Sequence, residues 1–275
     1  MFQVKQSPPA PSDGLVGIHH ELVNHWCALE DGGSIVAEFS RHKGGLLETA
    51  KIHAAVRSDE QAESLSMLDV SVVKIDLSNP YALAGYMIRN DVSIVIHTAT
   101  SIDAEVTQNL ITALKKRREA NGKKAFFIHE VVLTHISDLT TFYAQLTEAI
   151  LQKRALPACQ SGYYFTVSHS VRWWDILDRL AAAMHARVLV DEPTTKIWPS
   201  DAFAAESLGV PVNFAHSIWD SSPKVVCVNK DLIGWKPIWN SERLLESMDE
   251  EINDFLELGM PTSSLLASLG PEARR

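Results

Sequence analysis

The feature that most constrains this chain is a regular alternation between short apolar runs and amphipathic segments. Each run has four to six mostly apolar residues, while apolar residues recur at helical spacing between the runs. The runs are Ile52–Val56, Val70–Ile75, Val92–Ile96 and Ala125–Ile128. A strand that is apolar throughout is buried on both faces, as in a parallel sheet covered by helices on each side. The alternation therefore predicts an α/β fold with a parallel sheet that is covered by helices on both faces.

Helix start and stop signals lie between the runs and support the alternation. Gly32 and Gly33 precede apolar residues at helical spacing, and Gly44-Gly45 ends that segment. Acidic residues fill the first turn of a helix predicted over residues 59–68. The remaining signals are Asn79-Pro80 at a helix start and Asn121-Gly122 after a helix predicted over residues 103–119. We therefore expect one helix between each pair of consecutive strands.

The pattern changes after about residue 130, where longer helical segments dominate. We predict helices over residues 137–150, 173–185, 199–208 and 241–256, and strands over residues 162–167, 188–190 and 224–228. The resulting domain prediction has four parts: a flexible arm (1–14), a Rossmann-like dinucleotide-binding domain (15–130), a smaller C-terminal α+β cap that contacts substrate (131–260), and a tail (261–275).

Composition narrows the class of protein. The 275 residues carry a formal net charge of −9, which disfavours a nucleic-acid partner. No apolar run approaches the ~18 residues of a membrane helix, and the N-terminus lacks the apolar core of a secretory signal. The three scattered cysteines are typical of a cytoplasmic protein. The cluster His19, His20, His25 and Cys27 matches no zinc spacing, so we predict no metal site.

Polar and glycine residues follow the apolar runs at the positions where an open parallel sheet binds its ligand. Because such sheets bind ligands beyond the carboxyl ends of their strands, these residues predict a nucleotide crevice. They are Gly32 and Gly33, Arg57, Asp76 and Leu77, and Thr98 and Ala99. Arg57 lies where an acidic residue would bind a ribose 2′-hydroxyl and where arginine suits the 2′-phosphate of NADP. We therefore expect NADP or NAD as the cofactor, with NADP favoured.

An ordered series of segments over residues 32–250 resembles the NAD(P)-dependent epimerase/dehydratase family. The segments are 32–36 (GGSIV), 53–58 (HAAVRS), 74–80 (KIDLSNP), 95–99 (VIHTA), 114–124 (LKKRREANGKK), 134–139 (THISDL), 161–165 (SGYYF) and 233–237 (IGWKP). This family belongs to the extended and atypical short-chain dehydrogenases, and the likeness is greatest to its fungal NmrA-like branch. The resemblance implies a Rossmann fold and hydride transfer between NAD(P) and a small-molecule alcohol, aldehyde or ketone.

The resemblance also implies roles for individual residues. Gly32 and Gly33 match the end of the dinucleotide loop, and Arg57 matches the residue that contacts the adenosine ribose or its phosphate. Asp76 and Leu77 match the adenine contacts. Thr98 and Ala99 match the segment beside the ribose and nicotinamide.

The sequence departs from the family pattern at two places. The first two glycines of the phosphate loop are absent, and Glu30 and Asp31 precede Gly32 instead. A carboxylate about 5 Å from a phosphate costs roughly 1 kcal/mol in water and about 3 kcal/mol at an effective dielectric of 20. The family's Tyr-x-x-x-Lys pair, which supplies the proton, is also absent, because no tyrosine here is followed four residues later by lysine.

Two functional hypotheses follow from these matches and departures. The first is an NAD(P)-dependent oxidoreductase for a small-molecule substrate, with catalysis impaired by the missing segments. The second is a non-catalytic, NmrA-like nucleotide-sensing or regulatory binding protein. The sequence predicts no catalytic residues and no oligomeric state under either hypothesis.

Overall fold

The computed structural model describes residues 15–19, 32–98, 104–129, 134–208, 211–212 and 227–258. The chain divides into two compact units. The first, here called the sheet unit, comprises residues 1–22, 31–130 and 140–156. The second unit comprises residues 23–30, 131–139 and 157–275. Each unit is described by itself.

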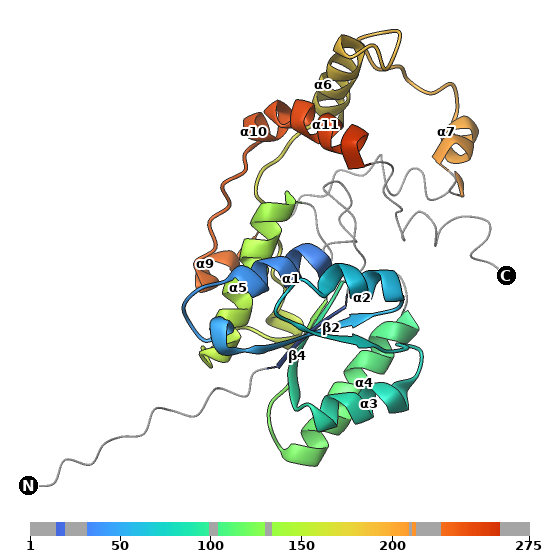
Figure 1. Ribbon diagram of the computed structural model, residues 1–275. Helices are drawn as coiled ribbons and strands as arrows, with labels where there is room; N and C mark the ends of the chain where they lie inside the picture. The colour runs from blue at the N-terminus through green and yellow to red at the C-terminus, as the bar shows by residue number, and fades with distance from the viewer. Residues whose placement is uncertain are drawn as a thin grey trace, which may run out of the picture. The chain divides into compact units, whose positions relative to one another are not determined.

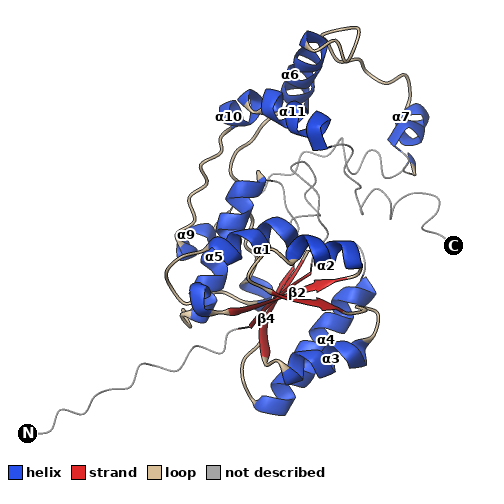
Figure 2. Cartoon of the chain, in the orientation of Figure 1, coloured by secondary structure: helices blue, strands red, loops and turns tan. Residues whose placement is uncertain are grey.

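The sheet unit contains one five-stranded sheet in which every pair of neighbours is parallel. Its strands are β1 (Leu15–His19), β2 (Lys51–Val56), β3 (Ser71–Lys74), β4 (Val92–His97) and β5 (Phe126–His129). Their order is β3-β2-β1-β4-β5, and all of them gather in one layer (Figure 2). This is the doubly wound arrangement, whose order reverses between β1 and β4. The predicted α/β fold with a Rossmann-type sheet is confirmed.

The central strand of the sheet is one that the sequence pattern does not predict. β1 contains Gly17 at its centre, and glycine weakens a strand signal, so the pattern predicts no element there. Pairing with β2 on one side and β4 on the other compensates for that weakness. The sequence predicts that Gly32 and Gly33 come just after the first strand of the sheet. They begin helix α1 (Gly32–Arg41), and residues 20–31 lie between it and β1, outside the described residues.

Helices cover both faces of the sheet (Figure 1). Helices α1 and α2 (Asp59–Leu65) lie on one face, and α3 (Pro80–Arg89) and α4 (Ala104–Asn121) lie on the other. The first helix buries Ile35, Val36 and Phe39, the helical spacing seen in the sequence. The opposite layer buries a cluster from α3, α4 and β4: Leu83, Met87, Val92, Val95, Leu110 and Leu114. Each such side chain contributes about 1.5–3 kcal/mol on burial.

The four consecutive basic residues 115–118, in the second half of α4, are only partly exposed to solvent. Arg117 is fully buried, and its guanidinium donates to Asp91 Oδ1 at 3.0 and 2.6 Å and to the Lys124 carbonyl at 2.9 Å. Burial would raise the pKa of Asp91, but hydrogen bonds from Lys123 and Arg117 outweigh it and lower that pKa. Arg117 therefore ties the start of β4 to the segment before β5.

A carboxylate from α5 (Ile136–Leu151) holds the connection between α1 and β2. Glu148 accepts the backbone N–H groups of Leu46 and Leu47 at 2.9 and 2.7 Å, at the start of the short helix η1 (Leu47–Thr49). Gly45 makes room for it, since a Cβ there would lie 2.7 Å from Glu148 Oε1. Gly45 also has a φ of +76°, which disfavours other residues.

Gly45→Ala is expected to destabilise the sheet unit more than Gly44→Ala does. Both glycines have positive φ, so both variants carry a backbone cost of roughly 1 kcal/mol. Only the Gly45 variant displaces Glu148 from two backbone donors, which adds at least about 1 kcal/mol. Urea unfolding of the two variants measures the difference. Equal free energies of unfolding would contradict this role for Gly45.

The described part of the second unit consists of helices and loops (Figure 2). Its helices are α6 (Trp173–Ala186), α7 (Asp201–Leu208), α9 (Lys230–Ile233), α10 (Ser241–Glu246), α11 (Met248–Leu258) and the short η2 (Cys159–Ser161). The predicted strands over residues 162–167 and 188–190 are wrong. A segment with strand propensity forms a strand only when it pairs with another strand, and no strand is present among the described residues of this unit. Of the predicted strand 224–228, residues 224–226 lie outside the described part and 227–228 are loop.

Two segments that carry the family resemblance meet in the second unit. The Asp138 carboxylate, only 2% exposed, accepts the backbone N–H groups of Ile238 and Trp239 at 2.9 and 3.0 Å. The Trp235 indole donates to the Asp138 carbonyl at 2.9 Å. The segments 134–139 and 233–237 are thus linked by a buried polar network across about 100 positions of sequence.

Asp138→Ala is expected to destabilise the second unit by about 1–3 kcal/mol, because it leaves two partly buried backbone donors without acceptors. Thermal unfolding followed by tryptophan fluorescence reports the change, since Trp235 and Trp239 flank the site. The exposed Glu257→Ala in α11 is the control for loss of a carboxylate. A similar small shift in both variants would contradict a structural role for Asp138.

Candidate functional site at the carboxyl edge of the sheet

The carboxyl ends of the strands bring several predicted site residues to one edge of the sheet. Arg57 follows β2, Asp76 comes two residues after β3, and Thr98 follows β4. Because all strands run parallel, these residues lie at the same edge. The predicted grouping of Arg57, Asp76 and Thr98 at a strand-end edge is therefore present in the sheet.

The turn after β2 is held by a capping box at the start of α2. Ser58 Oγ accepts the N–H of Gln61 at 3.2 Å, and Gln61 Oε1 accepts the N–H of Ser58 at 3.2 Å and of Arg57 at 2.9 Å. This arrangement satisfies backbone donors at the helix start. Partial burial lowers the pKa of Arg57 from its ordinary value, and a guanidinium stays charged despite such a change. The turn therefore presents a cation beside satisfied backbone groups.

The turn after β3 separates the two predicted adenine contacts. Asp76 is exposed, and its Oδ1 accepts the hydroxyl and the N–H of Ser78 at 2.7 and 2.9 Å. These bonds, the hydroxyl first, lower the pKa of Asp76. Leu77 is buried, and its carbonyl accepts from the Asn109 side chain at 3.2 Å. The Leu77 side chain packs in the core, so only Asp76 of this pair offers a side chain at the edge.

The other predicted site residues include Gly33, Thr98 and Ala99, which differ in their burial and in whether they are described. Gly33 is buried in the first turn of α1, which contains no acidic residue. Thr98 is 4% exposed. Ala99 lies outside the described residues, as do Glu30 and Asp31, whose predicted repulsion of a diphosphate stays a prediction. In the described ranges, no group of three His, Cys, Asp or Glu residues could hold a metal ion.

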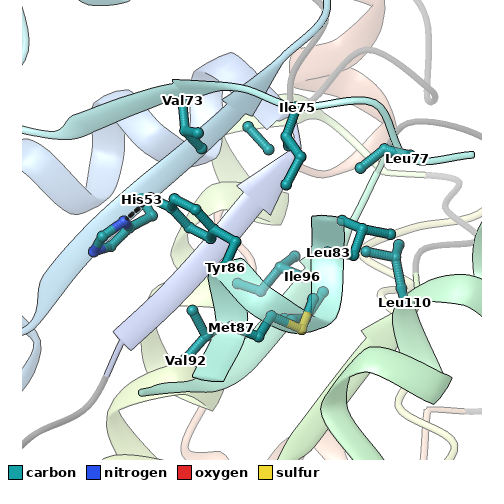
Figure 3. Close-up of a pocket in the computed structure, with 12 residues that line it drawn as sticks. His53, Val73, Ile75, Leu77, Leu83, Tyr86, Met87, Val92, Ile96 and Leu110 are labelled. Atoms are coloured by element: carbon teal, nitrogen blue, oxygen red, sulfur yellow. Dashed lines mark hydrogen bonds between the residues drawn. The ribbon is translucent and has the colours of Figure 1, made fainter. Parts of the chain in front are cut away.

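A small cavity lies between the sheet and helix α3 (Figure 3). Its volume is about 40 Å³, far below the several hundred Å³ of a cofactor pocket. Its walls are apolar apart from His53 on β2 and Tyr86 on α3, which share a hydrogen bond through His53 Nδ1. Leu77, Leu83 and Leu110 line the side away from this pair. The cavity is part of the core beneath the candidate site and is too small for a dinucleotide.

His53 is a buried titratable residue that the site prediction does not include. Its side chain is 3% exposed, and burial, followed by the nearby Lys51, lowers its pKa to about 4. Burial also raises the pKa of Tyr86, although Arg89 acts in the opposite direction. The pair is therefore neutral at physiological pH. The sequence signal for it is a histidine within an apolar run, since such a run predicts burial.

The free energy of unfolding is expected to fall by about 1–2 kcal/mol between pH 7.5 and pH 5 because of His53. The unfolded histidine, with a pKa near 6.5, binds a proton in this range, whereas the folded one, with a pKa of about 4, does not. The contribution is complete above pH 6.5 and is lost as the pH falls toward 4. Urea unfolding at both pH values, compared with His53→Asn, isolates the effect. An equal pH dependence in the variant would contradict it.

None of the described helices combines the length and the apolar composition of a membrane span.

The chemistry that the edge offers is recognition of an anionic or hydroxylated ligand, through the Arg57 cation and the Asp76 carboxylate. All five tyrosines of the sequence lack a lysine four residues later, and Tyr143 is buried in the core. No tyrosine of the sequence therefore matches the Tyr-x-x-x-Lys proton donor of the family that the sequence resembles.

The chain is similar to solved reductases at low sequence identity. No protein-family model and no curated protein matches the chain. A solved triphenylmethane reductase from Citrobacter sp. is similar at 12% identity with a TM-score of 0.47, covering 87% of this chain and 99% of that one. The NADPH-dependent quinone oxidoreductase of Escherichia coli, complexed with NADPH, is similar at 14% identity and a TM-score of 0.44, covering 92% and 98%. Likenesses this low transfer no activity, and the family resemblance stays a prediction.

Proposed function

We propose that this chain is an NAD(P)-dependent oxidoreductase of the epimerase/dehydratase type, acting on a small-molecule alcohol, aldehyde or ketone. The observation that carries the proposal is the doubly wound sheet with Arg57, Asp76 and Thr98 at its carboxyl edge. That edge is where open parallel sheets bind dinucleotides. A cytoplasmic setting is part of the proposal and rests on the three scattered cysteines.

Within this proposal, the adenosine half of the cofactor lies over β2 and β3. Arg57 would bind the ribose or its 2′-phosphate, and Asp76 would contact the adenine, as the family resemblance implies. Gly32 and Gly33 would lie beside the diphosphate at the start of α1, and Thr98 and Ala99 beside the second ribose and the nicotinamide. NADP is favoured over NAD because arginine pairs with a phosphate through two parallel hydrogen bonds.

The missing Tyr-x-x-x-Lys pair favours a second candidate, a nucleotide-sensing or regulatory protein that binds the cofactor without turnover. General acid catalysis by a side chain typically contributes 10²–10⁴-fold to a rate, so its loss alone could abolish useful activity. The two candidates share the nucleotide site and differ in chemistry. Oxidation of NADPH with a panel of small aldehydes and ketones separates them, since only the enzyme consumes cofactor.

NADPH is expected to bind the wild-type chain with a micromolar Kd, and Arg57→Ala is expected to weaken it at least about tenfold, because the 2′-phosphate loses a charged, bidentate hydrogen-bond donor. Titration followed by the fluorescence of the seven tryptophans measures both. Arg118→Ala is the matched control, because Arg118 is exposed near the end of α4, next to the amino ends of the strands. Absence of NADPH and NADH binding at millimolar concentration would remove the proposal.

A further inference from the structure

The strand next to β2 places a second cation beside the turn that carries Arg57. β3 pairs with β2 so that Lys74, its last residue, lies opposite Val56. The Lys74 ammonium is 2.8 Å from the carboxylate of Asp59, the first residue of α2. Asp59 is two residues after Arg57, so their Cα atoms lie within about 7.6 Å. Lys74 therefore extends across the sheet edge to the turn between β2 and α2.

The ion pair between Lys74 and Asp59 is exposed. The side chains retain 53% and 91% of their accessible surface, respectively. Exposed pairs of this kind contribute little to stability and are screened by salt. An anion with more charge than one carboxylate can therefore replace Asp59 at the ammonium with little loss of folding free energy.

Two backbone donors at this turn are already used within the protein. The N–H groups of Arg57 and Ser58 both donate to Gln61 Oε1, at 2.9 and 3.2 Å. Helix α2 has only seven residues, so its dipole is short. A phosphate bound here depends on cationic side chains, and those placed at this turn by the described residues are Arg57 and Lys74.

We propose that Lys74 is a second ligand for the ribose 2′-phosphate of NADP, and that Asp59 competes with that phosphate for the Lys74 ammonium. The inference rests on the proposed dinucleotide site and specifies how that site distinguishes NADP from NAD. The 2′-phosphate carries a charge between −1 and −2 at pH 7, so it binds the ammonium more strongly than the single carboxylate does. NAD presents a hydroxyl there and leaves the ion pair intact.

The test compares NADPH and NADH binding in variants of the full chain. Lys74→Gln is expected to raise the Kd for NADPH about 5–10-fold and to change that for NADH less than about twofold. Asp59→Asn is expected to lower the Kd for NADPH about 3–10-fold, again with little effect on NADH. Glu63→Gln is the control, because it removes the same charge from an exposed position on the same helix.

Adenosine nucleotides that lack the nicotinamide half distinguish recognition of the 2′-phosphate from recognition of the whole cofactor. Adenosine 2′,5′-bisphosphate should follow NADPH across the variants, and adenosine 5′-monophosphate should follow NADH. Equal effects of Lys74→Gln on both cofactors, or an Asp59→Asn effect no larger than that of Glu63→Gln, would overturn the role of this pair while leaving the nucleotide site in place. If the wild-type chain binds neither cofactor, the proposed function itself fails.

Discussion

Burial of both faces of the parallel sheet is the constraint on which the sheet unit depends. A strand such as β4, apolar along most of its length, is stable only with a helix layer on each side. Each crossover through a helix returns the chain to the same end of the sheet, so every strand ends at one edge. The location of the candidate site is thus a consequence of core packing, and the residues after the strands need only be polar to form a binding edge.

Buried polar contacts hold the loops that this layered core leaves outside regular structure. Glu148, Asp138 and Arg117 each accept from or donate to backbone groups that would otherwise be unpaired. Partial burial would raise the pKa of Glu148, but the N–H groups of Leu46 and Leu47, then Gln152 and His42, outweigh it and lower that pKa. The carboxylate is therefore ionised at neutral pH, where its hydrogen bonds are strongest. Two of these contacts join segments about 100 residues apart, which makes the connections part of each folded unit.

The carboxyl edge combines features that favour cofactor binding with a sequence that lacks the usual catalytic pair. Arg57 and Lys74 supply positive charge at the end of β2, while Asp59 neutralises part of it. In the proposed dinucleotide site, such a balance would favour discrimination between two cofactors that differ by one phosphate over tight binding of either. Both proposed functions use this edge, and they differ in whether a proton donor acts beside the bound cofactor.

The sequence alone determined the elements whose own pattern is strong. β2 to β5 and the helices between them lie within a few residues of their predicted positions, because apolar runs and caps such as Ser58 and Asn79 act locally. Only the tertiary structure decided that Leu15–His19 is the central strand and that residues 162–167 form no strand, because pairing depends on neighbours distant in sequence. It also decided that the side chain of Leu77 packs into the core and that Lys74 extends to Asp59. These two contacts depend on the register of the paired strands and on the face of the sheet to which a side chain points. No local sequence pattern encodes either property.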